Sequence, residues 1–435
     1  MRKTISKRII AMGLMLGIVF LLVACNTQDL PLKGQTKSET VDLMKEMSKG
    51  TSYSFTNDII GVDGYEENKV TTALSEFSLR LFEQNLEGSK DSNILISPTS
   101  IITALGMTSF GAKGDTLAQM EAVFGVSRGH LNHHNTQYMN SDSKELKLAN
   151  SIWFTNDERL TVKDEFLHFN NDFYDASIYE TAFNSATVDC INDWVEKNTN
   201  GMIKDILDEI PADAVMYLIN ALVFEAEWEE KYDETQIWQD AKFTSAKGET
   251  QKVDMMRSEE SMYLKDEKAT GFIKRYKGGK YAFAALLPNE GITVTDYVKN
   301  LSGQHLQELL ANPYTGGVVN AYLPQFSYEY DVEMSDLLEE MGMMDAFDGT
   351  KADFTNMATS TNGNIFLNRV IHKTFIEVSP VGTKAGAATV VEATDECAPW
   401  YEEVYEVRLD RPFLYMIIDL ENNMPIFIGE VNSVE

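Results

Sequence analysis

The 435-residue chain has little cysteine, little positive charge and no internal repetition. Three cysteines are too few for a disulfide framework. Lys and Arg total 37 against 67 Asp and Glu, a formal net charge of −30. Such a surface repels phosphate and sulfate groups, which excludes nucleic acids and heparin-like polyanions as partners. No repeat of 20–50 residues is present, which argues against a solenoid or a propeller.

The common catalytic motifs are also missing. The sequence has no G-x-S-x-G, H-E-x-x-H, Walker A or G-x-G-x-x-G segment. Ser141 and Lys144 match S-x-x-K, but they lie in a polar stretch without the partner motifs of that enzyme class, so the match is attributed to chance. His130, His133 and His134 cluster without a nearby carboxylate or cysteine, which favours a solvated loop over a metal site. The sequence therefore predicts no enzyme, cofactor or metal.

The first 24 residues have the pattern of an export signal. Four basic residues precede an uncharged apolar run over residues 9–24, which is short for a membrane span. The run ends Leu22-Val23-Ala24-Cys25 and resembles a bacterial lipoprotein signal, in which a lipidated cysteine becomes the new N-terminus. This predicts a signal peptide over 1–24 and an extracytoplasmic protein anchored to a membrane through Cys25. A plain secretory signal and a secreted protein are the alternative.

Residues 25–68 are polar and poor in aromatic residues, which predicts a flexible tether with a short helix near residues 41–47. Residues 69–435 show no break in composition and are assigned to one domain. Apolar periodicity predicts a strand entering a helix over 93–107, and a hairpin at Asn422-Asn423 between two strands within 411–431. Further helices are expected over 70–82, 189–198 and 334–344, and further strands over 147–154, 215–228, 281–287, 318–326 and 365–378. Irregular mixing of helices and strands predicts an α+β fold with large, mostly antiparallel sheets.

One segment near the C-terminus has the pattern of a strand although its composition is that of a loop. Nearly every residue from Gly382 to Ala388 is small, and strand-forming residues follow. Three of the four charged residues over positions 383–396 have even numbers, and the residues at odd-numbered positions are small and mostly apolar. Because strand side chains alternate between faces, the segment could be half-buried in a sheet. A loop with this pattern indicates two states, one exposed and one inserted.

With these features in place, the chain resembles the serpins, a family of serine protease inhibitors. The resemblance covers essentially all of residues 69–435. It rests on these matches to family motifs: Asn93, Ser97-Pro98, Ser100, Leu148-Ala149-Asn150, Trp194, Asn220, Phe224, Trp228, Leu323-Pro324-Gln325-Phe326, Ala352-Asp353-Phe354, Val370-Ile371-His372-Lys373, Arg411-Pro412-Phe413 and Phe427-Ile428-Gly429. The resemblance implies a monomer with three β-sheets, about eight or nine helices and an exposed reactive-centre loop.

The resemblance also assigns roles to individual residues. The hinge of the loop, E-x-G-T-x-A-x-A-A-T in the family, corresponds to Gly382, Thr383, Ala385, Gly386, Ala387, Ala388 and Thr389. Pro380 replaces the usual Glu. Ser97, Asn220 and His372 are expected to form a structural gating network beneath the main sheet. Thr383 is expected to lie in the exposed loop before insertion and to be buried afterwards.

The resemblance implies a single-use trap, in which a serine protease cuts the loop and the hinge then inserts into the main sheet. Family spacing places the reactive bond at Glu396-Cys397, which indicates a Glu-preferring protease. A register shifted by one or two residues, to Cys397 or Ala398, indicates an elastase-like protease with a pocket for small residues. A cysteine protease is the alternative target class. No Lys or Arg lies between Lys384 and Arg408, which excludes trypsin-like targets. The alternative function is a non-inhibitory binding protein with the serpin fold, which Pro380 favours.

Overall fold

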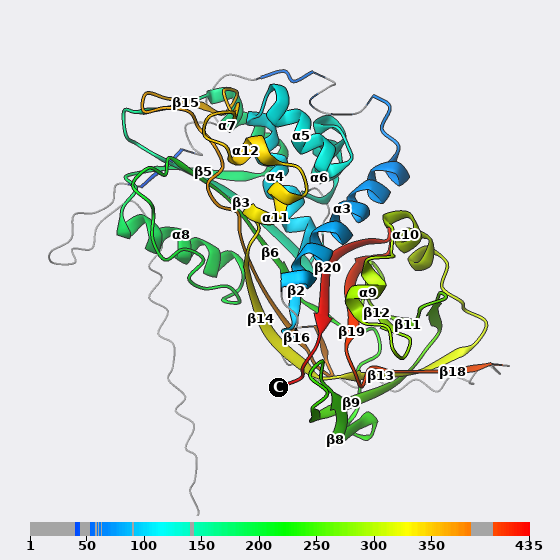
Figure 1. Cartoon of the computed structure of the whole chain (residues 1–435). Helices are drawn as coiled ribbons and strands as arrows, with labels where there is room; N and C mark the ends of the chain where they lie inside the picture. The colour runs from blue at the N-terminus through cyan, green and yellow to red at the C-terminus, as the bar shows by residue number, and fades with distance from the viewer. Residues whose placement is uncertain are drawn as a thin grey trace, which may run out of the picture. The chain divides into compact units, whose positions relative to one another are not determined.

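The computed structural model describes residues 40–43, 53–56, 59, 61, 63–88, 91–139, 143–383 and 403–435 (Figure 1). Contacts place residues 38–435 in one compact unit. Within the described ranges, no helix is long and apolar enough to cross a membrane. The α-helices are α3 (Glu67–Gly88), α4 (Pro98–Gly111), α5 (Gly114–Phe124), α6 (Arg128–Met139), α7 (Asp164–Tyr174), α8 (Ser185–Asn198), α9 (Val294–Val298), α10 (Gly303–Ala311), α11 (Ser335–Glu340) and α12 (Met344–Phe347).

A six-stranded sheet forms the centre of the fold and is mostly buried on both faces. Its order is β10-β11-β12-β19-β20-β2. The strands are β10 (Met262–Lys265), β11 (Ala269–Arg275), β12 (Tyr281–Pro288), β19 (Phe413–Asp419), β20 (Met424–Val431) and β2 (Ile94–Ile96). Every residue of β12, β19 and β20 is buried, which explains their nearly continuous apolar sequences. The turn between β19 and β20 includes Asn423 with φ of 56°, so the predicted hairpin is confirmed.

A second sheet, of order β18-β13-β9-β8, has one face on the core and one face toward solvent. Its strands are β18 (Val404–Arg408), β13 (Val318–Pro324), β9 (Thr250–Glu260) and β8 (Ile237–Thr244). β18 begins directly after the undescribed residues 384–402. This sheet therefore receives the chain where the predicted reactive loop ends.

The main sheet is divided into two groups of strands. One group has the order β1-β5-β3-β6, and the other has the order β14-β16-β17-β7. The strands are β1 (Val41–Asp42), β5 (Ala176–Thr181), β3 (Leu146–Thr155), β6 (Met216–Phe224), β14 (Phe326–Glu333), β16 (Ile371–Val378), β17 (Gly382–Thr383) and β7 (Ala226–Glu227), with a small separate pair β4 (Leu160–Val162) and β15 (Ala358–Ser360). The predicted α+β class with mostly antiparallel pairing is confirmed.

The folded unit begins earlier than the boundary expected at residue 69. Val41 pairs with Glu180 at the edge of β5, so part of the predicted tether is a strand, and the helix expected near 41–47 is not what forms at Val41–Asp42. Phe55 packs edge-on against Phe110 and Phe169. Leu43, Ile59 and Tyr65 also pack against the core. These contacts come from isolated residues, so the composition of the segment did not reveal them.

The histidine cluster is helical and not a solvated loop. His130, His133 and His134 lie on α6, and His134 is buried. Tyr65 packs edge-on against His133, so the preceding segment covers this part of the helix. The described residues contain no group of three or more His, Cys, Asp or Glu side chains arranged to hold a metal. Ser141 lies outside the described residues.

Two predicted elements are shorter than expected. The strand expected over 365–378 begins only at Ile371. The helix expected over 334–344 ends at Glu340, because the following turn needs Gly342 at φ of 118°. The chain resumes as the short helix α12.

Candidate functional site: an open slot in the main sheet

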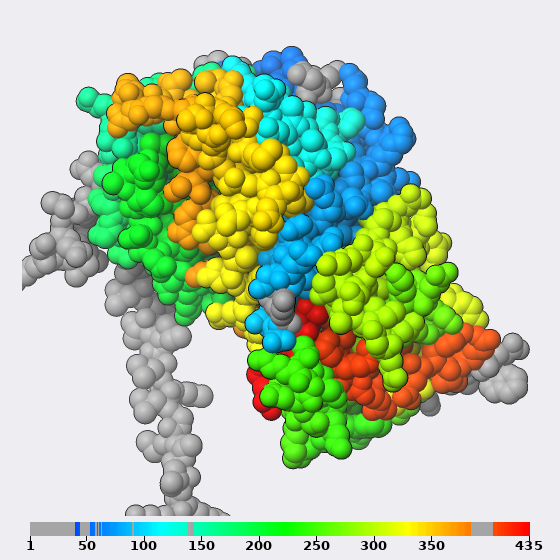
Figure 2. All heavy atoms as spheres, viewed as in Figure 1, coloured from blue at the N-terminus to red at the C-terminus, as the bar shows by residue number. Residues whose placement is uncertain are grey.

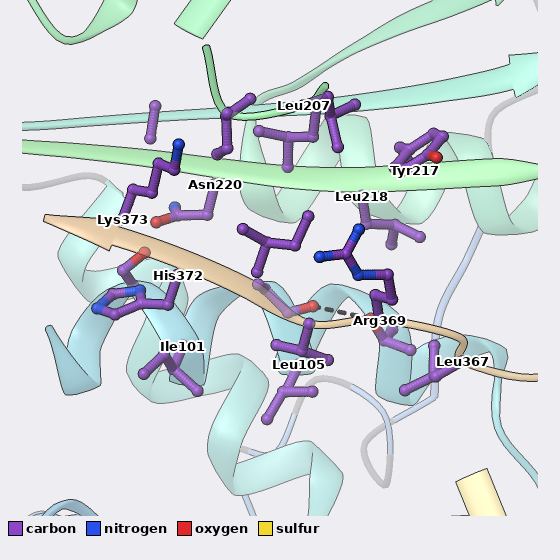
Figure 3. Close-up of a pocket in the computed structure, with 18 of the residues that line it drawn as sticks. Ile101, Leu105, Leu207, Tyr217, Leu218, Asn220, Leu367, Arg369, His372 and Lys373 are labelled. Atoms are coloured by element: carbon purple, nitrogen blue, oxygen red, sulfur yellow. Dashed lines mark hydrogen bonds between the residues drawn. The ribbon is translucent and has the colours of Figure 1, made fainter. Parts of the chain in front are cut away.

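Strands β6 and β16 lie side by side across a gap in the main sheet. The ladder partner of β6 is β3, and the ladder partners of β16 are β14 and β17. Among the described strands, no ladder joins β6 to β16. A cavity of about 470 Å³ lies between them and is lined by both strands (Figure 3). The main sheet is therefore open between β6 and β16.

The inner wall of this slot is helix α4. Its N-cap Ser97 accepts a hydrogen bond from the Ser100 N–H, and Pro98 occupies the first turn. The helix is buried on nearly all sides, as expected for a helix that lies beneath a sheet. Ile101 and Leu105 point from it toward the slot (Figure 3).

The segment after α8 lies over the outer side of the slot. Ile206 and Leu207 line the cavity, and Leu207 packs with the small apolar cluster beneath α8. Lys373 of β16 donates from Nζ to the Asp205 carbonyl at 2.8 Å and pairs with Asp331 at 3.2 Å. This contact ties β16 to the covering segment and must break if the strands separate.

Ser97 and His372, which the family resemblance assigned to one network, are in direct contact. The Ser97 N–H donates to His372 Nε2 at 3.0 Å, and Ser97 Oγ donates to the Ile426 carbonyl at 3.0 Å. The His372 ring is therefore an acceptor and is neutral. Burial lowers the pKa of His372 to about 4.

Asn220 of β6 lines the same cavity, but its hydrogen bond is not to Ser97 or His372. Its Nδ2 donates to Asn150 Oδ1 at 2.8 Å. Its Oδ1 is buried and has no hydrogen-bond partner among the described residues. A buried acceptor without a donor costs free energy, so a donor that entered the slot here would be stabilised. The structure thus brings Ser97 and His372 together and leaves Asn220 facing them across the gap (Figure 3).

We expect the buried His372 to make folding stability depend on pH. Because its folded pKa of about 4 is below the unfolded value near 6.5, the unfolded chain binds more protons between these values. Stability should therefore be full above pH 6.5 and should fall as pH drops toward 4, by about 3 kcal/mol for this group. Chemical unfolding at pH 7.5, 6 and 5 measures the slope.

His372→Asn should reduce that slope, since the amide carbonyl accepts the same bond without titrating. His134 is also buried, and its pKa is also lowered to about 4, so part of the slope should remain. An unchanged slope in His372→Asn would show that His372 does not titrate differently in the two states.

The end of the slot beside β7 is already filled by Gly382 and Thr383 of β17. Thr383 pairs with Val378 of β16 on one side and with Ala226 of β7 on the other. Its hydroxyl shares a 2.5 Å hydrogen bond with the Tyr276 hydroxyl. Burial raises the pKa of Tyr276, so that hydroxyl stays protonated. A Cβ on Gly382 would lie 2.1 Å from the Ala226 carbonyl oxygen, so only glycine fits there.

Pro380 lies in the bend between β16 and β17, outside both strands. Its carbonyl accepts the Tyr232 N–H at 3.0 Å, and the next carbonyl, of Val381, accepts the Trp228 N–H. No ladder bond is required from Pro380 at this position, so its missing N–H costs nothing in the described strands. The same bend is held by Trp228 Nε1, which donates to the Ser379 carbonyl.

The expectation that Thr383 lies in an exposed loop before insertion is wrong, because its side chain is only 3% exposed. No sequence signal pointed to Tyr276 as its partner, since 107 positions separate the two residues. The other predicted loop and anchor residues lie outside the described residues: Cys25, Ala385, Gly386, Ala387, Ala388, Thr389, Glu396 and Cys397.

Comparison with known proteins identifies this arrangement. The sequence profile described as "Serpin (serine protease inhibitor)" matches residues 72–434. The chain belongs to the serpin family. Members of this family are typically protease inhibitors and not enzymes, and some are non-inhibitory. Leukocyte elastase inhibitor A of Mus musculus is 31% identical to this serpin over 384 residues, covering 84% of this chain and 99% of the relative.

Tengpin, a thermophilic serpin, has been solved in a native and a latent state, and both structures are similar to this serpin. The native state gives a TM-score of 0.79 at 40% identity over 91% of this chain and 99% of tengpin. The latent state gives 0.75 at 43% identity over 84% of this chain and 98% of tengpin. The open slot between β6 and β16 is therefore part of a serpin whose fold is similar to both structures.

Proposed function

We propose that this serpin is a suicide inhibitor, which traps an elastase-like or Glu-preferring serine protease by loop cleavage and insertion into the main sheet. The observation that carries this proposal is the open slot, with Thr383 already paired at the end beside β7. A strand that continues from Thr383 into the slot would gain ladder partners on both sides. The slot is otherwise an energetic defect, because strand edges facing a gap leave backbone groups unpaired.

The pairing of Thr383 sets the register of the inserted strand. Every second residue of the inserted strand faces the same side of the sheet. This register would therefore place Ala385 between Ile376 and Phe224, and Ala387 between Thr374 and Leu222. These four neighbours point inward and are buried. Small side chains are required at those positions, because a packed sheet has no room for bulk.

The next inward position is Thr389. The same register would place it between His372 and Asn220, where the Asn220 Oδ1 lacks a donor. The Thr389 hydroxyl would supply one. The gating residues would thus become part of a hydrogen-bonded contact that exists only after insertion.

The chemistry begins as ordinary proteolysis. The protease serine oxygen attacks the Glu396 carbonyl, the peptide bond to Cys397 breaks, and the new amine leaves with the proton. An ester then joins Glu396 to the protease. Insertion of about twelve residues at about 3.3 Å each would move that ester on the order of 40 Å before water hydrolyses it. The energy comes from ladder bonds and apolar burial that the native state lacks.

A panel of serine proteases on a denaturing gel tests this proposal. We expect a covalent complex with an elastase-like or a Glu-specific protease, and none with trypsin, because no cation lies between Lys384 and Arg408. The name of the murine relative supports the elastase-like class. Clean cleavage without a complex would favour the non-inhibitory alternative, and a trypsin complex joined within residues 393–399 would refute the assigned bond.

We further propose that Cys25 carries lipid and holds the inhibitor at a membrane surface outside the cytoplasm. The proposal rests on the apolar run that ends in Ala24-Cys25. In a bacterial host, labelling with a fatty-acid analogue should depend on Cys25. Cys25→Ser should lose the label and leave the membrane fraction, whereas Cys190→Ser, at a partly buried position on α8, should keep both. Labelling of Cys25→Ser equal to that of wild type would refute lipidation at Cys25.

A further inference from the structure

The solvent face of the sheet β18-β13-β9-β8 carries its charges in rows. Tyr322 lies directly opposite Arg408 on one side and Arg257 on the other. Residues that lie opposite one another in neighbouring strands share a face of the sheet. Two positions along, the next row has a carboxylate at each end. The two rows are Arg408–Tyr322–Arg257 and Glu406–Asn320–Glu259.

The arginine row is built on aromatic rings. The Arg408 guanidinium lies 3.7 Å from the centre of the Tyr322 ring and 5.4 Å from the Trp238 ring. The Trp238 and Tyr322 rings are 5.2 Å apart. Trp238 nevertheless remains 43% exposed. Tyr322 is buried beneath the Arg408 guanidinium, so a partner would meet the Trp238 ring and the guanidinium group that Tyr322 supports. Side chains held in this way lose little conformational entropy on binding, and Trp and Arg are typical of residues that dominate protein interfaces.

Neither guanidinium group has all its N–H donors paired among the described residues. Arg257 donates from Nη2 to Asn320 Oδ1 at 2.8 Å, but its Nε has no partner there. The Arg257 and Arg408 guanidinium groups lie 3.7 and 3.6 Å from their neighbouring carboxylates, the long end of ion-pair range. Their side chains are 41% and 32% exposed. Exposed pairs of this kind contribute little to stability, so each guanidinium group keeps N–H donors that a partner carboxylate could accept.

This face lies between the two ends of the reactive loop. The Glu403 carbonyl, just after the loop, accepts the Val318 N–H, and Val404 begins β18 with 65% exposure. At the other end, Tyr232 donates its N–H to the Pro380 carbonyl. Tyr232 also lines a cavity of about 360 Å³ together with Trp238 and Arg257. Figure 1 shows the four strands grouped below the central sheet, and Figure 2 shows part of β8 and β18 on the surface there.

We propose that the aromatic–arginine face, made of Trp238, Arg257, Tyr322 and Arg408, is a second docking surface for the protease that attacks the loop. It would bind a surface segment of the protease that carries one or two carboxylates beside an apolar side chain. The inference rests on the proposed function. A second copy of the chain fits less well, because two acidic molecules with 67 carboxylates against 37 cations repel each other.

The rate of complex formation tests the proposal. The probes are pancreatic elastase and a Glu-specific serine endoprotease, and the faster of the two in forming the covalent complex is used. Arg257→Glu/Arg408→Glu is compared with Lys69→Glu/Lys351→Glu, which makes the same charge change outside this sheet, at side chains that are 75% and 60% exposed. Trp238→Ala tests the apolar contact without changing charge.

We expect the arginine variant to lose about tenfold in the association rate constant relative to the lysine variant, as interface charges commonly do. The loss should shrink at high salt, and the number of inhibitor molecules consumed per protease should not change, because insertion is untouched. An intact melting temperature confirms folding, and if Arg408→Glu perturbs it, Arg257→Glu alone is used.

Equal rates in the arginine and lysine variants would overturn the docking surface while the covalent complex still supports the proposed function. Absence of any complex with wild type would overturn the proposed function itself. A wild-type dimer that dissociates in the arginine variant, at unchanged rates, would assign the face to self-association and refute the proposal.

Discussion

Ala387→Arg should convert this serpin from an inhibitor into a substrate. The register set by Thr383 brings position 387 between the buried Thr374 and Leu222 after insertion. A long cation there would have to be enclosed by packed side chains without a counter-ion, at a cost of at least several kcal/mol. Insertion would stall, and the ester would be hydrolysed before the protease is displaced.

Three measurements report this outcome. The denaturing gel should show cleaved variant and little covalent complex. Cleaved wild type should melt far above the uncleaved protein, because a full strand has been added, and cleaved Ala387→Arg should gain much less. Ala387→Ser is the control, since a small hydroxyl fits the same position and should keep both trapping and stabilisation. If Ala387→Arg traps protease as efficiently as wild type, insertion in this register is not the mechanism.

Thr383→Arg should destabilise the uncleaved protein. The sequence alone predicts that the uncleaved protein tolerates this change in an exposed loop and only loses trapping. The structure instead places Thr383 in a buried contact with Val378, Ala226 and the Tyr276 hydroxyl. Removing one partner and burying a charge costs about 3–5 kcal/mol. At roughly 2–4 °C per kcal/mol, the melting temperature should fall by about 10 °C.

Thr383→Ser is the matched control, because it keeps the hydroxyl that bonds Tyr276 and should cost much less. Tyr276→Phe removes the same hydrogen bond from the other side, at about 1 kcal/mol. A melting temperature for Thr383→Arg equal to that of wild type would mean that the hinge is not seated in the sheet before cleavage.

The sequence predicted those parts of the fold whose signals are local. Alternating or continuous apolar patterns located most strands, such as β12 and β19, and the Asn422-Asn423 pair located the hairpin. Patterns of this kind depend only on which face of a strand or helix is buried. Family motifs supplied the positions of Ser97, Asn220 and His372, which all line the slot.

Local signals were weak where isolated contacts decide the structure. The polar segment before residue 69 contacts the domain through scattered residues that are too few to alter its composition. They are Val41, Leu43, Phe55, Ile59 and Tyr65. The α6 histidines are helical because the rest of the domain packs against that helix, although its own apolar periodicity is poor. Such elements gain their stability from tertiary packing and not from intrinsic propensity.

The sequence by itself determined the family, the alternating hinge and the absence of a cation in the bait segment. Only the tertiary structure decided where the hinge begins and which groups receive it. Thr383 meets Tyr276, the slot separates β6 from β16, and Asn220 keeps an unpaired acceptor facing His372. Each of these features joins residues more than one hundred positions apart, so it depends on how whole sheets pack and no periodicity in the chain encodes it.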